Sequence, residues 1–400
     1  MITRALKLGF AAFEKANPLP GYVRSAVRLM LMCRTAALGG HVESCPDGHF
    51  HRVWYNSCGH RFCPKCAFLR IEKWLLGWKS RLLATDHYHV IFTIPEELNE
   101  LWLCNVRLMA SLLFWAVSCT LLELLGDEKY LGVVPGIIAT LHTWGRTLVL
   151  HPHIHCLITG GGLTNGGKWK LVNNGYLIPI RVVMPVFRGK FIYAVRKALR
   201  DGKLTLPSVM RPQQLENLLN KLGRKKWNVY IRQRCPEGTG VLMYLGRYIS
   251  GGPISKSRLI EVTEDRVLFR YADNKDLDED KRPINKVMSL SVSDFIRRLL
   301  LHVPVPGLQY VRSYGIYANT KRPELARCRE QLGQDGLEAP GPLGWEDALA
   351  KVSEKHPERC PICGKQLLYS GVIPRKRQGE SASFRDFEKL IQPVGMPVAA

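Results

Sequence analysis

The sequence predicts an α+β protein in which a core of antiparallel sheet and flanking helices follows a small cysteine-rich module. Two observations carry this prediction. Cysteines gather between residues 45 and 66, and β-rich segments at residues 87–95 and 147–159 are separated by long stretches with apolar residues at helical spacing. Strands and helices in this order favour an α+β fold, and a chain of 400 residues with 46% hydrophobic content can bury a full core.

The order of these elements divides the chain into four parts. An N-terminal helical segment precedes the cysteine module and its linker helix, and the core is followed by a C-terminal region. In residue numbers these parts are 1–40, 41–83, 84–260 and 261–400.

One apolar run, at residues 108–125, is long enough to resemble a membrane span. It contains Ser118 and Glu123 and is preceded by Arg107, so we expect a buried helix and no membrane association. The N-terminus lacks the charged-then-apolar pattern of a signal peptide. We therefore expect a cytoplasmic protein whose 12 cysteines are thiols or metal ligands rather than disulfides.

The cysteine window has the spacing of a structural zinc site. Cys63 and Cys66 enclose a proline and a lysine, which is the tight knuckle that lets two thiolates bind one tetrahedral Zn²⁺. Cys45 and Cys58 complete a set of four cysteines. The region between them offers His49 and His51 where a second cysteine is usual, so three cysteines and one histidine, His49, form the alternative set.

A second knuckle lies near the C-terminus, where Cys360 and Cys363 enclose Pro-Ile. It is a candidate for a second zinc, and Cys328 and His356 are its nearest partners in the sequence. The remaining cysteines, Cys33 among them, have mostly apolar neighbours and are interpreted as small core residues.

The run His151-Pro-His153-Ile-His155 lies within the second β-rich segment. Side chains alternate across a strand, so His153 and His155 share a face while Ile154 points into the layer behind. A single histidine on an apolar strand is usually a hydrogen-bonded core residue, but three in alternation would each need a buried partner. The pattern favours a site where His153 and His155 bind one metal ion.

Composition indicates an extended polyanion as the partner. Lys and Arg number 57 against 34 Asp and Glu, which gives a formal charge of +23. Neutralising several phosphates at once is the main source of nucleic-acid affinity. No lipidation motif or basic amphipathic helix favours anionic membrane, and no protein partner is evident. The expected DNA-contacting residues are Arg61, Lys65, Arg247, Lys256 and Arg258.

Two tyrosines supply a candidate nucleophile. Residues 241–249 have a helical pattern, in which Tyr244 and Tyr248 lie one turn apart on one face. A phenol with a pKa near 10 is a poor nucleophile at neutral pH unless a base or metal assists. Tyrosine attack on a DNA phosphate stores the bond energy in a phosphotyrosine ester, so the strand can be rejoined without ATP.

Several of these motifs occur in the order typical of a known family. His87 to Pro95, His151 to His155, Tyr244-Leu-Gly-Arg-Tyr248 followed by Ser257-Arg-Leu, and Val311 to Gly315 resemble the two-tyrosine rolling-circle transposases of bacterial insertion sequences, members of the HUH nuclease superfamily. The N-terminal cysteine cluster resembles the zinc-binding domain of the insertion-sequence-91-like group, and the resemblance spans nearly the whole chain.

The resemblance implies an HUH nuclease core and a rolling-circle transposition activity. It implies that His153 and His155 bind catalytic Mg²⁺ or Mn²⁺, with His89 as the candidate third ligand and no role assigned to His151. Tyr244 and Tyr248 would be the nucleophiles, and the substrate would be single-stranded DNA at the transposon ends, with the protein nucleoid-associated when bound. The missing second cysteine of the N-terminal knuckle departs from the family pattern.

Two other classes remain open from the sequence. One is a plasmid replication initiator or conjugative relaxase of the same superfamily. Relaxases usually place the tyrosine ahead of the histidines, whereas here it follows them, and the zinc module favours the transposase. The other is a non-catalytic zinc-dependent DNA-binding protein in which the histidines and tyrosines are structural.

Overall fold

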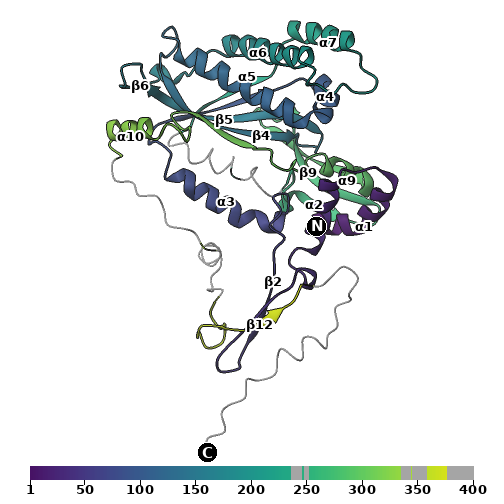
Figure 1. Ribbon diagram of the computed structural model, residues 1–400. Coiled ribbons are helices and arrows are strands. Elements are labelled where there is room, and N and C mark those ends of the chain that lie inside the picture. The colour runs from purple at the N-terminus through teal and green to yellow at the C-terminus, as the bar shows by residue number, and fades with distance from the viewer. Residues whose placement is uncertain (236–245, 247–251, 335–343, 345–357, 376–400) are drawn as a thin grey trace, which may run out of the picture.

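The computed structural model describes residues 1–235, 246, 252–334, 344 and 358–375. Within these ranges the strands form a six-stranded central sheet and two three-stranded sheets, and every strand pair is antiparallel. Helices cover both faces of the central sheet (Figure 1). The predicted α+β class with an antiparallel sheet is therefore confirmed.

The central sheet has the order β11-β4-β5-β3-β7, with β6 paired to β5. Its longest strand, β5, contains the histidine run and pairs with β3 on one side and β4 on the other. The sequence predicted β3 and β5 but not β4. The bounds are β3 (His87–Thr93), β4 (Val134–Trp144), β5 (Leu150–Leu163), β6 (Trp169–Leu171), β7 (Val229–Cys235) and β11 (Val311–Gly315).

One face of this sheet is covered by a layer of helices (Figure 1). Apolar side chains from alternate strand positions, such as Phe92 and Ile154, pack with this layer into the largest core cluster. The helices Asn99–Cys104 and Val106–Gly126 are separated at Asn105, whose side chain donates hydrogen bonds to Leu101 O and Thr205 O at 2.9 and 2.7 Å. The layer consists of α4 (Asn99–Cys104), α5 (Val106–Gly126), α6 (Ile180–Arg200) and α7 (Pro212–Arg224), with the 3₁₀ helices η2 (Glu96–Leu98) and η3 (Asn173–Gly175) nearby in sequence.

Helix α5 is long and apolar enough to cross a membrane by length and composition, the single such helix found among the described residues. Of its most apolar window, 61% is buried inside the protein. Met109, Leu113 and Val117 are fully buried in the core cluster beneath it. Its apolar character is thus accounted for by packing between the sheet and α6, as the sequence predicted for a buried helix.

The opposite face of the sheet lies toward α3 (Pro64–Lys79) and α10 (Arg322–Gln331) (Figure 1). Proline near the first position of each helix fixes a helical φ where no intrahelical N–H bond is needed. Leu75 and Trp78 of α3 pack with Leu157 of β5 and with Tyr317 in a separate cluster. Helix α3 therefore lies on the face that the apolar layer leaves uncovered.

A second unit joins the N-terminal helices to a three-stranded sheet. Phe10 and Phe13 pack with Phe269 and Phe295 in one apolar cluster. A Cβ added at Gly9 would meet Val292 Cγ1 at 2.5 Å, so glycine permits the close crossing of the helix Ile2–Ala16 and the helix Val292–Leu300. The elements are α1 (Ile2–Ala16), α2 (Gly21–Met32), η4 (Lys256–Arg258), β8 (Leu259–Val262), β9 (Arg266–Leu277), β10 (Pro283–Ser291) and α9 (Val292–Leu300).

The third sheet joins strands that are far apart in the sequence, in the order β12-β1-β2. It contains β1 (Gly40–Ser44), which follows η1 (Ala36–Leu38), together with β2 (His51–Tyr55) and β12 (Leu368–Ile373). The chain beyond residue 260 thus contributes a strand to each sheet: β9 and β10 to one, β11 to the central sheet and β12 to this one.

Candidate metal centres and nucleic-acid groove

The histidines of the central sheet lie on the face toward α3. Ile154, Cys156 and Ile158 of β5 belong to the apolar cluster under α5, whereas Leu157 belongs to the cluster with α3. Alternation along a strand therefore places His153 and His155 on the α3 side. Tyr317 ties the helix to this face, because its ring lies 5.7 Å from Trp78 and its hydroxyl bonds His87 Nε2 at 2.9 Å.

Three buried histidines meet on this face. His142 of β4 stands opposite His153 in the strand register, and one ring nitrogen from each of His142, His153 and His155 lies within 4.8 Å of the others. Their ring centroids are 4.2 to 5.2 Å apart. The structure brings together the predicted pair and adds His142. Alternation along β4 places His142 on the same face as Ile138 and Thr140, and this pattern could have indicated it. A single histidine in an apolar strand, however, gave no reason to predict a metal ligand.

Hydrogen bonds orient two of the three rings. His153 Nδ1 donates to the backbone carbonyl of His151 at 2.6 Å, which leaves Nε2 as the ring's acceptor atom. His155 Nδ1 lies 2.7 Å from His89 Nε2. If Nδ1 carries the proton, His155 also offers Nε2, and His89 acts as the outer partner that metal-binding histidines usually have. His89, predicted as the third ligand, lies beside His155, and His142 joins the two other predicted histidines in the cluster.

Burial keeps the His142 and His153 imidazoles uncharged at neutral pH. Desolvation lowers the pKa of His153 to about 3 and that of His142 well below its usual value, with further lowering from neighbouring histidines. Only a neutral imidazole has a lone pair for a metal ion, so protons do not compete for these nitrogens near pH 7. Two or three imidazoles in contact, with no carboxylate among the described residues of the cluster, suit a divalent cation.

The candidate nucleophiles Tyr244 and Tyr248, and Arg247 between them, lie outside the described residues. Gly246 is described: it is helical, buried and packed on α3. A Cβ added there would lie 3.0 Å from Leu75 Cδ2 and 3.4 Å from Ile71 Cγ2. Gly246 therefore lies against α3, the helix over the histidine-bearing face.

The cysteines form two clusters, and the members of each differ from the predicted sets. Cys58, Cys63 and Cys66 are joined by Cys33, not by Cys45. Cys33 Sγ and Cys58 Sγ lie 3.4 and 3.7 Å from Cys66 Sγ. A zinc with four bonds of about 2.3 Å to sulfur requires sulfurs about 3.8 Å apart, so this set fits tetrahedral Zn²⁺. Hydrogen bonds lower the pKa of Cys66 to about 4 and favour its thiolate, and the hydrogen bond from Cys63 has the largest effect.

The sequence did not predict Cys33 as a member, because the position of α2 in the fold brings it to the cluster. No short spacing to the other cysteines indicates it. Cys33 follows directly after α2, and its sulfur accepts a hydrogen bond from Cys58 N at 3.4 Å. Cys45 lies instead with His49, Cys360 and Cys363. Of the partners considered for the C-terminal knuckle, Cys328 is buried near Tyr317 and His356 lies outside the described residues.

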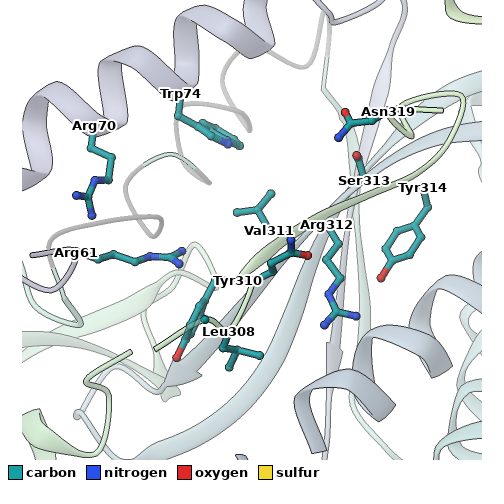
Figure 2. A pocket seen from close by; sticks show the side chains of 12 residues that line it. Arg61, Arg70, Trp74, Leu308, Tyr310, Val311, Arg312, Ser313, Tyr314 and Asn319 are labelled. Atoms are coloured by element: carbon teal, nitrogen blue, oxygen red, sulfur yellow. The ribbon is translucent and has the colours of Figure 1, made fainter. Parts of the chain in front are cut away.

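A groove of about 760 Å³ lies between α3 and β11. Figure 2 shows Arg61 and Trp74 extending from one side toward the strand with Tyr310 and Val311. The Arg61 guanidinium lies 4.5 Å from the centre of the Tyr310 ring. Leu141 N, next to His142, donates to Tyr310 O at 2.8 Å, so the groove borders the histidine cluster. It is lined by Arg61, Arg70, Trp74, Gly307, Leu308, Gln309, Tyr310, Val311, Arg312, Ser313, Tyr314 and Asn319.

The other residues predicted to contact DNA have different surroundings. Lys65 Nζ donates to Cys33 O at 2.9 Å, so it stabilises the loop beside the cysteine cluster. Arg258 donates to the carbonyls of Arg270 and Arg146 and lies over Phe269. Lys256 is exposed on η4, away from the groove lining. Of the predicted set, Arg61 alone is described in the groove, and Arg70 and Trp74 were not among the predicted contacts.

Comparison with known proteins gives the family. Residues 136–324 match the family model described as "Putative transposase" and residues 6–94 match the "Transposase zinc-binding domain" of IS91 type. The chain is 36% identical over 349 residues to the "Putative transposase y4qJ" of Sinorhizobium fredii, covering 85% of this chain and 86% of the relative. It is 28% identical over 361 residues to the transposase for insertion sequence element IS801 of Pseudomonas savastanoi pv. phaseolicola, covering 87% and 83%.

Among solved structures, the conjugative relaxase TrwC in complex with oriT DNA matches 40% of this chain and 68% of its own, at 14% identity and a TM-score of 0.23. The sequence relationships are much stronger than this structural one. They cover most of both chains and include the zinc-binding domain as well as the region with the histidines. The chain belongs to the IS91-like family of transposases, with the zinc-binding domain at its N-terminus.

Proposed function

We propose that this transposase cuts and rejoins single-stranded DNA at the ends of an insertion sequence by rolling-circle transposition. Its relatives are transposases, which implies a DNA-cleaving enzyme that binds DNA. The observation that supports the proposal best is the cluster of His142, His153 and His155. These residues would hold Mg²⁺ or Mn²⁺, while the four-cysteine cluster binds Zn²⁺ in a structural role.

The histidines are suited to one task, which is to fix a divalent cation on the sheet. The backbone carbonyl of His151 and the ring of His89 hold the rings of His153 and His155. What the bound ion supplies is polarisation of the scissile phosphate and stabilisation of the charge that develops on it. Because the rings are buried and oriented in advance, little reorganisation is needed when that charge appears.

Tyr244 or Tyr248 provides the nucleophile in this proposal. Its phenol oxygen bonds to the scissile phosphorus and gives up its proton, and the P–O3′ bond breaks to leave a protonated 3′ hydroxyl. The product is a 5′-phosphotyrosine ester. Attack of a 3′ hydroxyl on that ester reverses the exchange and joins strands with no external energy source, and the second tyrosine serves a second transesterification.

The groove beside the histidine cluster supplies a path for a single strand. Arginines and aromatic rings both line it, among them Arg61, Arg70, Trp74 and Tyr310, and the Arg61 guanidinium lies over the Tyr310 ring. Exposed bases stack on aromatic rings and guanidinium planes, while cationic groups bind the phosphates. A duplex hides its base faces, so this lining favours single-stranded over double-stranded DNA.

The test is formation of a covalent adduct. The full-length protein is incubated with labelled single-stranded DNA from a transposon end and Mn²⁺, and adducts are separated on a denaturing gel. Wild type is expected to form an adduct, and the Tyr244→Phe, Tyr248→Phe double variant is expected to form none. The matched control is Tyr193→Phe, because Tyr193 is exposed on α6, on the other side of the sheet.

An adduct that persists in the double variant would disprove the nucleophile assignment. Failure of wild type to form any adduct with Mg²⁺ or Mn²⁺ would favour a non-catalytic DNA-binding protein. Binding of labelled strand by the double variant should match wild type, since affinity comes from the basic surface rather than the phenols.

A further inference from the structure

The second cysteine cluster joins segments that are 311 or more residues apart. Cys45 and His49 come from the turn between β1 and β2, and Cys360 and Cys363 come from the C-terminal knuckle. One ligand atom from each lies within 4.8 Å of the others. Cys45 Sγ is 3.4 Å from Cys363 Sγ and 3.9 Å from His49 Nδ1. These separations match the edges of a tetrahedron around one small ion.

We infer that these residues form a second zinc site, which attaches the C-terminal segment to the N-terminal domain. Three thiolates and an imidazole are a ligand set that selects Zn²⁺ over the harder Mg²⁺ and Mn²⁺. All four positions are filled by protein, which is the mark of a structural site. The family model for the zinc-binding domain ends at residue 94, so half of this ligand set lies outside it.

Contacts beside the cluster also join the two segments that supply its ligands. Strand β12 pairs with β1 from Gly40 opposite Ile373 to Ser44 opposite Leu368, directly beyond the ligands. Lys365 Nζ bonds Asp47 Oδ1 at 2.8 Å across the same junction. Leu367 packs with Cys45 and Cys360, which are 4% and 2% exposed. Backbone pairing, an ion pair and apolar packing thus bring the β1–β2 turn and the C-terminal knuckle together independently of any metal.

The unit is too small to be stable through apolar burial. Its cluster of buried hydrophobic residues holds Cys45, Cys360 and Leu367, with Phe50 against it. A module with so little apolar surface usually depends on a metal or disulfide. The ion would therefore fix β12 as the edge strand of the N-terminal sheet and hold both ends of the chain together.

The experiment is zinc content per chain, measured on the full-length protein by mass spectrometry of the metal. The Cys360→Ser, Cys363→Ser double variant is expected to hold one equivalent less than wild type. Zinc at the four-cysteine cluster or at the histidines is present in both proteins and cancels in the difference. Cys104→Ser, at an exposed cysteine outside both clusters, is the control and should keep the wild-type content.

A second set of variants tests the nitrogen ligand. His49→Ala should lower the zinc content, and His49→Cys should restore it by replacing one ligand with another. His51→Ala should leave it unchanged, because His51 is exposed at the start of β2 and its Nδ1 bonds Ser44 Oγ at 2.8 Å. Hydrogen exchange in Leu368–Ile373 should become faster in the double-cysteine variant, while exchange in β5 stays slow.

Equal zinc content in wild type and the double-cysteine variant would overturn the inference. So would loss of zinc in His51→Ala with full content in His49→Ala. Neither readout uses DNA cleavage, so this site and the proposed nuclease activity are tested separately.

Discussion

The two faces of the central sheet differ in kind although they share the same strands. On β5 the residues toward α5 are Ile154, Cys156 and Ile158, all fully buried in the main core. The residues toward α3 include His153 and His155, which are 9% and 3% exposed. One face is packed for stability and the other presents donor atoms. Strand alternation thus lets a single rigid element carry core and site together.

The largest expected effect falls on the apolar face. Phe92 is fully buried and contacts Phe187 edge-on with ring centres 5.0 Å apart. Phe92→Ala should lower the free energy of unfolding by about 3–5 kcal/mol, measured by urea denaturation. Adduct formation per folded molecule should be nearly unchanged. A stability change under 1 kcal/mol would mean that this face does not carry the core.

The next largest effect is expected on metal binding, from loss of His89, which lies beside the proposed ligand His155. His89→Ala removes the ring that lies 2.7 Å from His155 Nδ1. Loss of such an outer partner typically weakens metal binding about 10–100-fold. Titration with Mn²⁺, followed by calorimetry, measures it. Complete loss of binding would instead indicate that His89 is itself a ligand.

The next prediction compares the two faces in their contribution to the binding of single-stranded DNA. Trp74→Ala removes an indole from the groove wall, and loss of one stacked base typically costs about 1–3 kcal/mol. The affinity for single-stranded DNA should fall accordingly in fluorescence anisotropy, while that for duplex should change little. Trp115→Ala is the control, because Trp115 is exposed on the opposite helical layer. Equal losses for both variants would exclude the groove as the binding path.

The smallest effect concerns pH. Burial lowers the pKa of His302 to about 4, and its ring bonds Thr143 Oγ1 and Leu148 O at 3.1 and 3.0 Å. The unfolded chain binds a proton near pH 6.5, so stability is full above that pH and falls as pH drops toward 4. Between pH 7 and 5.5 this histidine should account for a loss of about 1 kcal/mol.

His302→Gln tests that assignment against wild type at both pH values. The variant should show a smaller loss of unfolding free energy between pH 7 and 5.5. An identical loss in the two proteins would show that other groups cause the acid sensitivity.

Local patterns predicted the parts of the site that lie close in sequence. Alternation in β5 gave His153 and His155, and the short knuckle gave Cys63 and Cys66. The missing members come from elsewhere in the fold. His142 depends on the register of β4 against β5, and Cys33 on where α2 ends.

The C-terminal region was the least predictable part of the fold. Its strands pair with partners far away in the chain, and nothing in a short window specifies such pairing. Cys45 was grouped with its sequence neighbours because their spacing resembled one site. In the structure, the pairing of β1 with β12 assigns it to the other cluster instead.

The most direct test of the central claim compares two histidines whose ring centres lie 5.2 and 5.1 Å from that of His153. His142→Gln and His151→Ala are measured for Mn²⁺ binding and for Mn²⁺-dependent adduct formation, with zinc content as a check on folding. His142→Gln should lose both Mn²⁺ binding and adduct formation. His151→Ala should keep both, because only the backbone carbonyl of His151 bonds the His153 ring. The reverse pattern would contradict a metal site made of His142, His153 and His155.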